Sequence, residues 1–533
     1  MKKRVAFVSF LILIMFLLCM IRLCFIISSK EYMSVFSENG KYTVTAGHID
    51  GMIYDKNMNP LVNRKKVYKA VVIPNLESIS KIRKYVVDKE EFSENIKTGK
   101  PFVCKVTENN FESDDIYVFE IPLRYSDDDL AVHITGYTSD GRGVCGIEKT
   151  YDPVLRGNGK DVEITFSSDA QGGVLKGRDI FVSDENVESG VVLTLDSDIQ
   201  KICEEVCGNV KKGAAVVMDV KSGDILAMAS FPLYKRSEIS KALENEDSPL
   251  LNRALCAYSV GSVFKLVTCA AAHELGTDKN FMYECDGKIT IDGSDFHCHN
   301  LEGHGKQDVS KALVNSCNPF FIELGKRIDS DYFLKTAMRF GFGREIVLSG
   351  DILSNSGTLP SLSDIEKSGE KANFSFGQGK LTATPLQVAQ FTCAIANGGN
   401  MPAAKVIKGY TSDGKTIKNR KKDISAEVMS KETSFYLRSL MKDVVYKNDE
   451  TKAKPFYTSA GVKTSTAQTG RFDLNGKELN NAWLTGFFPA NNPEYAVTVL
   501  VEDADSGNKD AAPLFRKIAD RIYKLKGWWY VWK

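Results

Sequence analysis

Three short polar motifs in the second half of the 533-residue chain constrain its fold more than any other feature. They are Ser-Val-Phe-Lys at 262–265, Ser-Cys-Asn at 316–318 and Lys-Thr-Ser-Thr at 463–466. Each motif alone is common by chance. Together they offer the hydroxyl and amine groups that acyl-transfer chemistry uses, so a fold that uses them must bring three distant segments to one cleft.

The first motif lies at the start of a predicted helix. Ser262 follows Gly261, and the apolar run 263–275 ends at Gly276, a typical helix stop. Ser262 and Lys265 are then three residues apart on one helical face, within side-chain reach. A serine needs a base to become a nucleophile, and a lysine can be that base when burial and nearby cations lower its pKa. The alternative is a serine helix cap with an exposed lysine.

The other two motifs can face the same cleft. Ser316 and Asn318 lie in a short loop between a predicted helix at 308–315 and another that begins at Pro319. Simple helix capping by both side chains is the alternative. The motif at 463–466 follows Ala-Gly-Val and is predicted to form an edge strand that lines the cleft.

The elements around these motifs follow an order that can be read from hydrophobic periodicity and turn signals. The predicted elements are a strand at 191–196, a helix at 200–206 capped by Ser197 or Asp198, a hairpin of strands 214–220 and 224–230, a second hairpin of strands 482–488 and 495–502, and a closing helix at 512–526.

The motifs and this order of elements resemble the class B penicillin-binding proteins, whose S-x-x-K, S-x-N and K-T-G motifs occur in the same sequence. Further matching segments are Leu251–Arg253, Gly303–Gly305, Gly377–Gly379 with Thr384–Gln387, and Trp483–Gly486. The resemblance implies a penicillin-recognising serine transferase fold of the α/β (α+β) class, with an antiparallel sheet and an all-helical insertion. A β-rich pedestal domain and one N-terminal transmembrane helix would precede it.

The resemblance also implies catalytic roles. Ser262 would attack the carbonyl of a D-Ala-D-Ala peptide, with Lys265 as its base. Ser316 would relay a proton to the leaving amine, while Asn318 binds the acyl-donor backbone and contacts Lys265. Lys463 would supply positive charge for the terminal carboxylate of the substrate.

The residues that follow Lys463 are expected to bind the substrate. The resemblance assigns this role to Thr464, Ser465 and Thr466, and it assigns an oxyanion hole to the backbone N–H groups of Ser262 and Thr466. Ser465 departs from the family pattern because it replaces the usual glycine, which leaves room for the acyl chain. The acyl-enzyme mechanism is therefore expected, but normal β-lactam affinity is in doubt.

The expected function is a peptidoglycan D,D-transpeptidase that cross-links stem peptides and is covalently inhibited by β-lactams. The alternatives are a D,D-carboxypeptidase or β-lactamase-type hydrolase, or a non-catalytic penicillin-binding scaffold. The resemblance implies a SEDS-type glycosyltransferase as membrane partner. No cofactor is expected, and the near balance of 69 basic and 68 acidic residues leaves no footprint for nucleic acid.

The N-terminus predicts an uncleaved membrane anchor. An apolar stretch at 5–27 is long enough to span a bilayer and follows three basic residues within 1–4, which are expected to stay in the cytoplasm. A cleaved signal peptide is the alternative. Behind the anchor we expect a pedestal domain at 28–190, rich in short strands, and a transpeptidase domain at 191–533 outside the plasma membrane.

Twelve cysteines are many for an exported chain. Cys285, Cys298 and His304, with the neighbouring histidines 297 and 299, match no usual zinc spacing, so no metal is expected. A disulfide between Cys298 and Cys317 is a hypothesis for a redox switch, with Cys285–Cys298 as a competing pair and free thiols as the alternative. The aromatic tail 527–533 is expected to pack on the domain or to touch the membrane interface.

Overall fold

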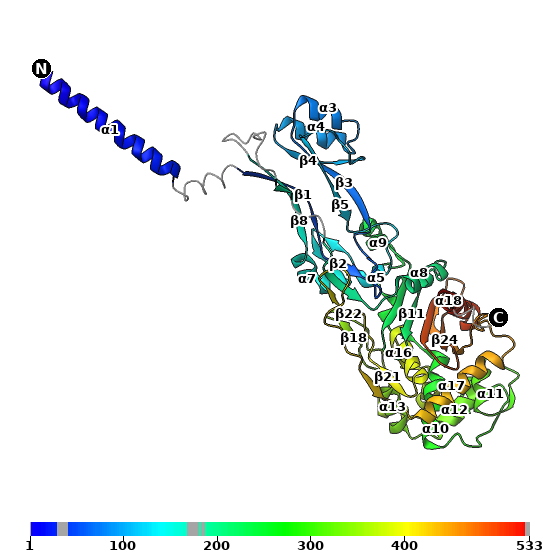
Figure 1. Ribbon diagram of the computed structural model, residues 1–533. Helices are drawn as coiled ribbons and strands as arrows, with labels where there is room; N and C mark the ends of the chain where they lie inside the picture. The colour runs from blue at the N-terminus through cyan, green and yellow to red at the C-terminus, as the bar shows by residue number, and fades with distance from the viewer. Residues whose placement is uncertain (1, 29–40, 168–180, 183–186, 528–533) are drawn as a thin grey trace. The chain divides into compact units, whose positions relative to one another are not determined.

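The computed structural model of the protein (Figure 1) describes residues 2–28, 41–167, 181–182 and 187–527. The chain divides into two compact units. The first comprises Met1–Asp50, Asn63–Arg124 and Asn158–Val187, and the second comprises Gly51–Val62, Tyr125–Gly157 and Glu188–Lys533. The second unit therefore includes two segments, 51–62 and 125–157, that were expected in the pedestal. Except for its first residue, the aromatic tail lies outside the described residues.

The N-terminal helix α1 (Lys2–Ser28) contains the stretch Lys3–Phe25, whose mean hydropathy is 2.7. These 23 residues are long and apolar enough to cross a membrane, in agreement with the anchor expected at 5–27.

Two small sheets and two helices build the rest of the first unit. One sheet has the order β1-β8-β9 and the other the order β4-β3-β5, and all pairs are antiparallel. The bounds are β1 Lys41–Ile49, β3 Lys65–Val72, α3 Leu76–Ile82, α4 Lys89–Lys97, β4 Phe102–Val106, β5 Ile116–Leu123, β8 Lys160–Ser167 and β9 Phe181–Val182. These short strands agree with the strand-rich region expected in this part of the chain.

Strand β3 separates two apolar cores because its side chains alternate between faces. Val71 packs with residues of β1 and β8, whereas Ala70 and Val72 pack with Ile82 of α3 and Phe92 of α4. The two cores explain how short strands support this region without a single large interior.

The second unit is built on a five-stranded antiparallel sheet of order β12-β11-β26-β25-β24. The strands are β11 Gly213–Asp219, β12 Ile225–Phe231, β24 Gly461–Phe472, β25 Glu478–Phe488 and β26 Tyr495–Ala504. Both predicted hairpins are present, and β24, which carries the third motif, is an edge strand as expected.

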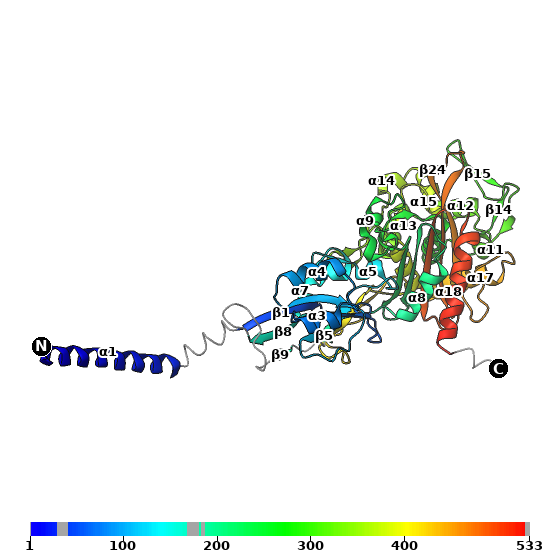
Figure 2. The same cartoon turned by 90° about the horizontal axis from the view of Figure 1, so that it is seen from above.

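Helices cover both faces of this sheet (Figures 1 and 2). Thr485 of β25 bonds to Thr392 of α16 (Pro385–Ala396), with 2.6 Å between the hydroxyl oxygens. A side chain on the adjacent Gly486 would instead meet Phe515 of α18 (Ala512–Leu525). Since adjacent strand residues point to opposite faces, α16 and α18 lie on opposite sides of the sheet.

One expectation near residue 195 needs correction. Helix α8 (Ser197–Val206) is capped by Asp196, whose carboxylate accepts the N–H groups of Asp198 and Ile199, and not by Ser197 or Asp198. The strand before it, β10 (Gly190–Leu193), lies outside the five-stranded sheet. It pairs with β2 (Met52–Tyr54) and β22 (Ile407–Thr411), which explains why residues 51–62 join the second unit.

A largely helical insertion lies between β12 and β24 and holds the first two motifs. Its longer helices are α10 Lys265–Leu275, α11 Val309–Val314, α12 Asn318–Lys326, α13 Ser330–Arg339, α15 Ser368–Phe376, α16 and α17 Lys431–Tyr446. Several short antiparallel strand pairs interrupt it, including the hairpins formed by β14 Tyr283–Cys285 with β17 Gly305–Gln307 and by β15 Lys288–Ile291 with β16 Ser294–His297.

Candidate active site

Ser262 is presented by a tight turn at the start of α10. It lies in the 3-10 turn Gly261–Phe264, directly before the helix. Gly261 has φ +61°, and a Cβ there would come within 2.4 Å of the Ser465 hydroxyl oxygen. The N–H of Gly261 also donates to the carbonyl of Gly377 at 2.8 Å. Only glycine fits this position, and it places Ser262 at the helix N-terminus.

Side chains of the sheet hold the loop that precedes Ser262. The Ser465 hydroxyl donates to the carbonyl of Val260, and the Trp483 indole donates to the carbonyl of Ser259, both at 2.9 Å. Ser465 is only 3% exposed. Its hydroxyl is therefore hydrogen-bonded to the loop that precedes Ser262, which argues against the expectation that it crowds the acyl chain.

Lys265 lies fully buried one turn after Ser262. Its Nζ donates to the Ser316 carbonyl and to Oδ1 of Asn318, both at 2.7 Å, and lies 3.3 Å from the Ser316 hydroxyl. The carbonyl and the amide oxygen can only accept. A neutral amine would satisfy both with its two N–H bonds and keep its lone pair for a hydroxyl proton.

The electrostatics of this position favour the neutral amine. Burial, followed by the positive charge of Lys463, holds the pKa of Lys265 well below its ordinary value. Within the described chain, the Ser262 hydroxyl has no hydrogen-bond partner, so the expected bond from Ser262 to Lys265 is not formed in this structure. Such bonds often tighten only when substrate is bound.

Ser316 stands in a strained turn between α11 and α12. Its φ of +51° lies in the left-handed region, which costs a residue with a side chain about 1–3 kcal/mol and is typical of active sites. The turn directs both the carbonyl and the hydroxyl of Ser316 toward Lys265. The second motif thus does more than cap a helix.

Lys463 completes the group from strand β24. Only 1% of this lysine is exposed, and its Nζ donates to the Ser316 hydroxyl at 3.1 Å and to the carbonyl of Thr464 at 2.9 Å. Burial lowers the pKa of Lys463 to about 7. The Ser316 hydroxyl therefore lies between two lysine amines, which is the position a proton relay requires.

The three motifs meet at one open cleft of about 910 Å³. Ser262, Ser316 and Asn318 line it from the helical insertion, while 464–466 line it from β24. Lys265 and Lys463 lie buried beneath it. The remaining wall includes side chains from helix α15, from strands β16 and β25 and from the segments between elements: His297, Cys298, His299, Asn373, Gln378, Glu478 and Asn508.

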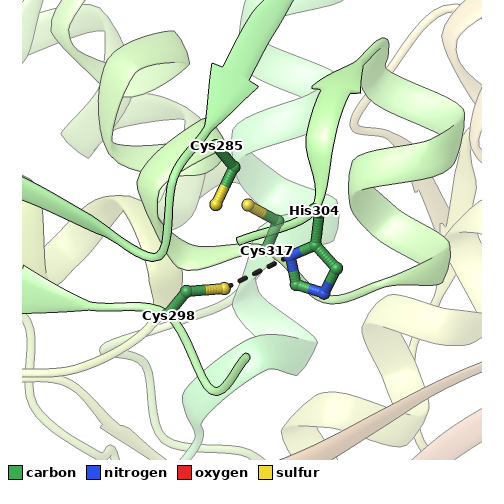
Figure 3. Close-up of side chains that lie close together, drawn as sticks. All are labelled: Cys285, Cys298, His304 and Cys317. Carbon is green, nitrogen blue, oxygen red and sulfur yellow. Dashed lines mark hydrogen bonds between the residues drawn. The ribbon is translucent and has the colours of Figure 1, made fainter. Parts of the chain in front are cut away.

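A second cluster (Figure 3) adjoins the cleft, because Cys298 lines the cleft and also belongs to the cluster. The donor atoms of Cys285, Cys298, His304 and Cys317 all lie within 4.8 Å of one another. The sequence spacing of Cys285, Cys298 and His304 does not predict a metal site. The structure joins them to Cys317, the middle residue of the second motif, whereas the histidines at 297 and 299 are not part of the group.

Comparison with known protein families decides the identity of this fold. The family description "Penicillin binding protein transpeptidase domain" matches residues 213–520, which is more than half of the chain. This chain belongs to the penicillin-binding protein transpeptidase family. The match includes all three motifs and the five-stranded sheet.

Curated relatives of this transpeptidase extend the similarity to nearly the whole chain. Stage V sporulation protein D of Bacillus subtilis is 28% identical over 562 residues, covering 97% of this chain and 85% of the relative. The peptidoglycan D,D-transpeptidase MrdA of Acinetobacter baumannii is 26% identical over 547 residues, covering 88% of this chain and 80% of the relative.

Solved structures support the fold. The D,D-transpeptidase domain of a peptidoglycan glycosyltransferase from Eggerthella lenta has a TM-score of 0.66 at 23% identity, covering 90% of this chain and 99% of that chain. The ceftriaxone acyl-enzyme complex of penicillin-binding protein A from Mycobacterium tuberculosis has a TM-score of 0.64 at 23% identity, covering 77% and 94%. The expected penicillin-recognising fold is thus confirmed.

Proposed function

We propose that this transpeptidase cross-links peptidoglycan stem peptides through an acyl-enzyme on Ser262 and that β-lactams acylate the same hydroxyl. The observation that supports this most strongly is the buried arrangement beside Ser262, in which the Ser316 hydroxyl lies 3.3 Å from the amine of Lys265 and 3.1 Å from that of Lys463. Two amines and a bridging hydroxyl can accept one proton and deliver another within a few ångströms.

Acylation begins when the amine of Lys265 takes the proton of the Ser262 hydroxyl. The serine oxygen then bonds to the carbonyl carbon of the penultimate D-alanine, and the carbonyl electrons move to its oxygen. When the carbonyl re-forms, the C–N bond breaks and D-alanine leaves. Its nitrogen receives a proton through Ser316, which can be replenished from Lys265.

The N–H groups of Ser262 and Thr466 stabilise the oxyanion in this proposal, and the first benefits from its place at a helix N-terminus. The hydroxyls of Thr464 and Thr466 receive the substrate carboxylate, and Lys463, buried beneath the cleft, supplies positive charge for it. Asn318 is suited to hold the acyl-donor backbone because Lys265 already fixes its amide oxygen at 2.7 Å.

The second half-reaction transfers the acyl group to an amine of a neighbouring stem peptide. The amine attacks the ester carbonyl, its proton passes to Lys265 or Ser316, and the Ser262–acyl bond breaks to restore the hydroxyl. Water can attack the same ester in place of the amine. Transpeptidation and hydrolysis therefore share the acylation steps and differ only in the group that attacks the acyl-enzyme.

The cellular setting is part of the proposal. Helix α1 anchors the protein in the plasma membrane, with 1–4 in the cytoplasm, residues 28–190 as pedestal and 191–533 as the transpeptidase domain outside. The basic residues before the span favour this orientation. We further propose a SEDS-type glycosyltransferase as partner. A penicillin-binding protein (PBP2) of Helicobacter pylori with a similar fold has been solved in complex with MreC, so a protein with this fold can bind a partner protein.

The test is a reaction of the full chain in detergent with a stem peptide that ends in D-Ala-D-Ala, with and without an amine acceptor. We expect released D-alanine and a cross-linked product whose yield rises with acceptor. Ser262→Ala should abolish both, and Ser237→Ala, on the exposed surface, should change neither. D-Alanine release with no acceptor product at any acceptor concentration would instead identify a hydrolase.

A further inference from the structure

The cluster beside the active site brings together four metal-binding side chains from four separate elements. Cys285 ends β14, Cys298 follows β16, His304 precedes β17, and Cys317 precedes α12. All three cysteines are buried, and their sulfur atoms and the imidazole of His304 point toward a common centre (Figure 3). The Sγ atom of Cys298 lies 3.4 Å from Nδ1 of His304.

These distances fit a zinc ion. Tetrahedral zinc binds sulfur at about 2.3 Å and imidazole nitrogen at about 2.0–2.1 Å, which places neighbouring donor atoms about 3.5–3.8 Å apart. The observed donors all lie within 4.8 Å of one another. Small side-chain rotations are therefore enough to close the group around one ion. Three thiolates and one imidazole also match the donor preference of zinc and exclude calcium or magnesium, which prefer oxygen.

We propose that Cys285, Cys298, His304 and Cys317 bind one structural zinc ion that holds the second catalytic motif in place. Four protein ligands fill a tetrahedral shell, so the ion has no open position for water or substrate. It acts by fixing the positions of its ligands, and the three thiols lose their protons when it binds.

The backbone already shapes this site. The N–H of His304 donates to the carbonyl of Cys285 at 3.0 Å, and the N–H of Cys298 donates to the carbonyl of Gly287 at 2.8 Å. Gly303 has φ +81°, and a Cβ there would collide with the carbonyl oxygen of Cys285 at 2.2 Å. The two hairpins therefore bring three ligands together before any ion binds, which reduces the entropy lost on binding.

The fourth ligand connects the ion to the catalytic groups. Cys317 stands between Ser316, whose φ is strained, and Asn318, whose Nδ2 donates to the carbonyl of His297 at 3.3 Å. An ion on Cys317 and Cys298 would fix the motif and this neighbouring loop at once. This coupling rests on the proposed function, whereas metal binding itself does not.

The competing state is the disulfide between Cys298 and Cys317 that the sequence suggests as a redox switch. Neither Cys298 nor Cys317 forms a disulfide in this structure. A disulfide would remove two of the four donors and leave Cys285 and His304 unable to hold the ion. Zinc binding and this disulfide therefore exclude each other.

The first experiment measures metal content. Full-length protein purified in detergent without chelator should contain one zinc per chain by plasma mass spectrometry. Cys285→Ser and His304→Ala should lose it, while Cys393→Ala, at a buried cysteine outside the cluster, should keep it. A wild-type protein without stoichiometric zinc, or equal zinc in Cys285→Ser and Cys393→Ala, would overturn the proposal.

A second measurement does not depend on the folding of variants. Wild-type protein stripped with a chelator and reloaded with Co²⁺ should show tetrahedral d–d bands and sulfur-to-cobalt charge-transfer absorption. Absence of these bands in stripped protein that keeps its circular dichroism would contradict the site. So would mass mapping that finds a Cys298–Cys317 disulfide in protein freshly isolated under reducing conditions.

The coupling is tested by acylation of the same preparations with a fluorescent penicillin. We expect the second-order rate to fall at least tenfold after chelation and to recover when Zn²⁺ is added back. An unchanged rate in stripped protein would remove the coupling but leave the metal site. Loss of labelling in zinc-loaded wild-type protein would instead count against the proposed function.

Discussion

At the residue scale, Ser465 is the position where this chain departs from the family it resembles. Its hydroxyl donates to the Val260 carbonyl at 2.9 Å instead of facing the acyl chain. We expect Ser465→Gly to lower the free energy of unfolding by about 1 kcal/mol, because one hydrogen bond contributes about this much to stability. Bulky β-lactams should not acylate this variant faster than the wild type. Ser465→Ala, which keeps the Cβ, should behave alike in stopped-flow acylation. Faster acylation of Ser465→Gly alone would restore the clearance hypothesis.

Lys265 predicts the pH dependence of acylation. A protonated amine cannot accept the Ser262 proton, so the rate should rise with pH through the lowered pKa of Lys265 and level off well below pH 10. Lys463, whose pKa is about 7, lowers the pKa of Lys265 while it is charged. Lys463→Met should therefore move the acidic limb to higher pH. A slower reaction with an unshifted limb in the pH–rate profile would refute this coupling.

At the element scale, the turn that opens α10 depends on a single glycine. Gly261→Ala places a side chain at φ +61° and 2.4 Å from the Ser465 oxygen. The left-handed conformation alone costs about 1–2 kcal/mol, and the collision must displace Ser262 or β24. We expect loss of most penicillin labelling and a lower melting temperature.

The matched control is Gly369→Ala, where an added Cβ meets nothing within 4 Å and no left-handed φ is required. This variant should label and melt like the wild type. Normal labelling of Gly261→Ala would show that the turn adapts, and that the position of Ser262 does not depend on this glycine.

The elements could be predicted from sequence where the signal is local. Alternating apolar runs and turn residues located both hairpins, and Gly276 located the end of α10. The cap of α8 was missed because Asp196, Ser197 and Asp198 are all good capping residues, and only the structure shows which carboxylate meets free N–H groups.

Contacts between segments that are far apart in the sequence could not be predicted in this way. The pairing of β10 with β2 and β22 joins segments more than a hundred residues apart. The four residues of the metal-binding cluster come from two hairpins and the start of a helix. Their spacing in the sequence depends on the lengths of the hairpins and matches no short zinc motif, so the sequence does not predict the site. The family resemblance named the expected catalytic residues, which the structure brings together, but the hydrogen bond from Ser465 to Val260 could be seen only in the structure.

At the scale of the whole molecule, the anchor and the catalytic site are separable. Every site residue lies in the second unit, whereas α1 belongs to the first. Removing residues 1–28 should therefore move the protein from the membrane fraction to the soluble fraction and leave its rate of penicillin labelling within about twofold, since no catalytic group is touched. Ser262→Ala in the shortened chain is the control for specific labelling. A shortened chain that stays in the membrane fraction, or that penicillin no longer labels, would contradict the separation of anchor and catalytic site.

The most direct test of the account is the site of covalent penicillin attachment. The full chain is incubated with penicillin, digested, and the adduct is located by tandem mass spectrometry. We expect one adduct, on Ser262, and none in Ser262→Ala, whose fold should persist because only a hydroxyl is lost. Removing the nucleophile should lower the rate by several orders of magnitude, as for groups that act as a unit. An adduct on another residue, or persistent labelling of Ser262→Ala, would contradict the central claim.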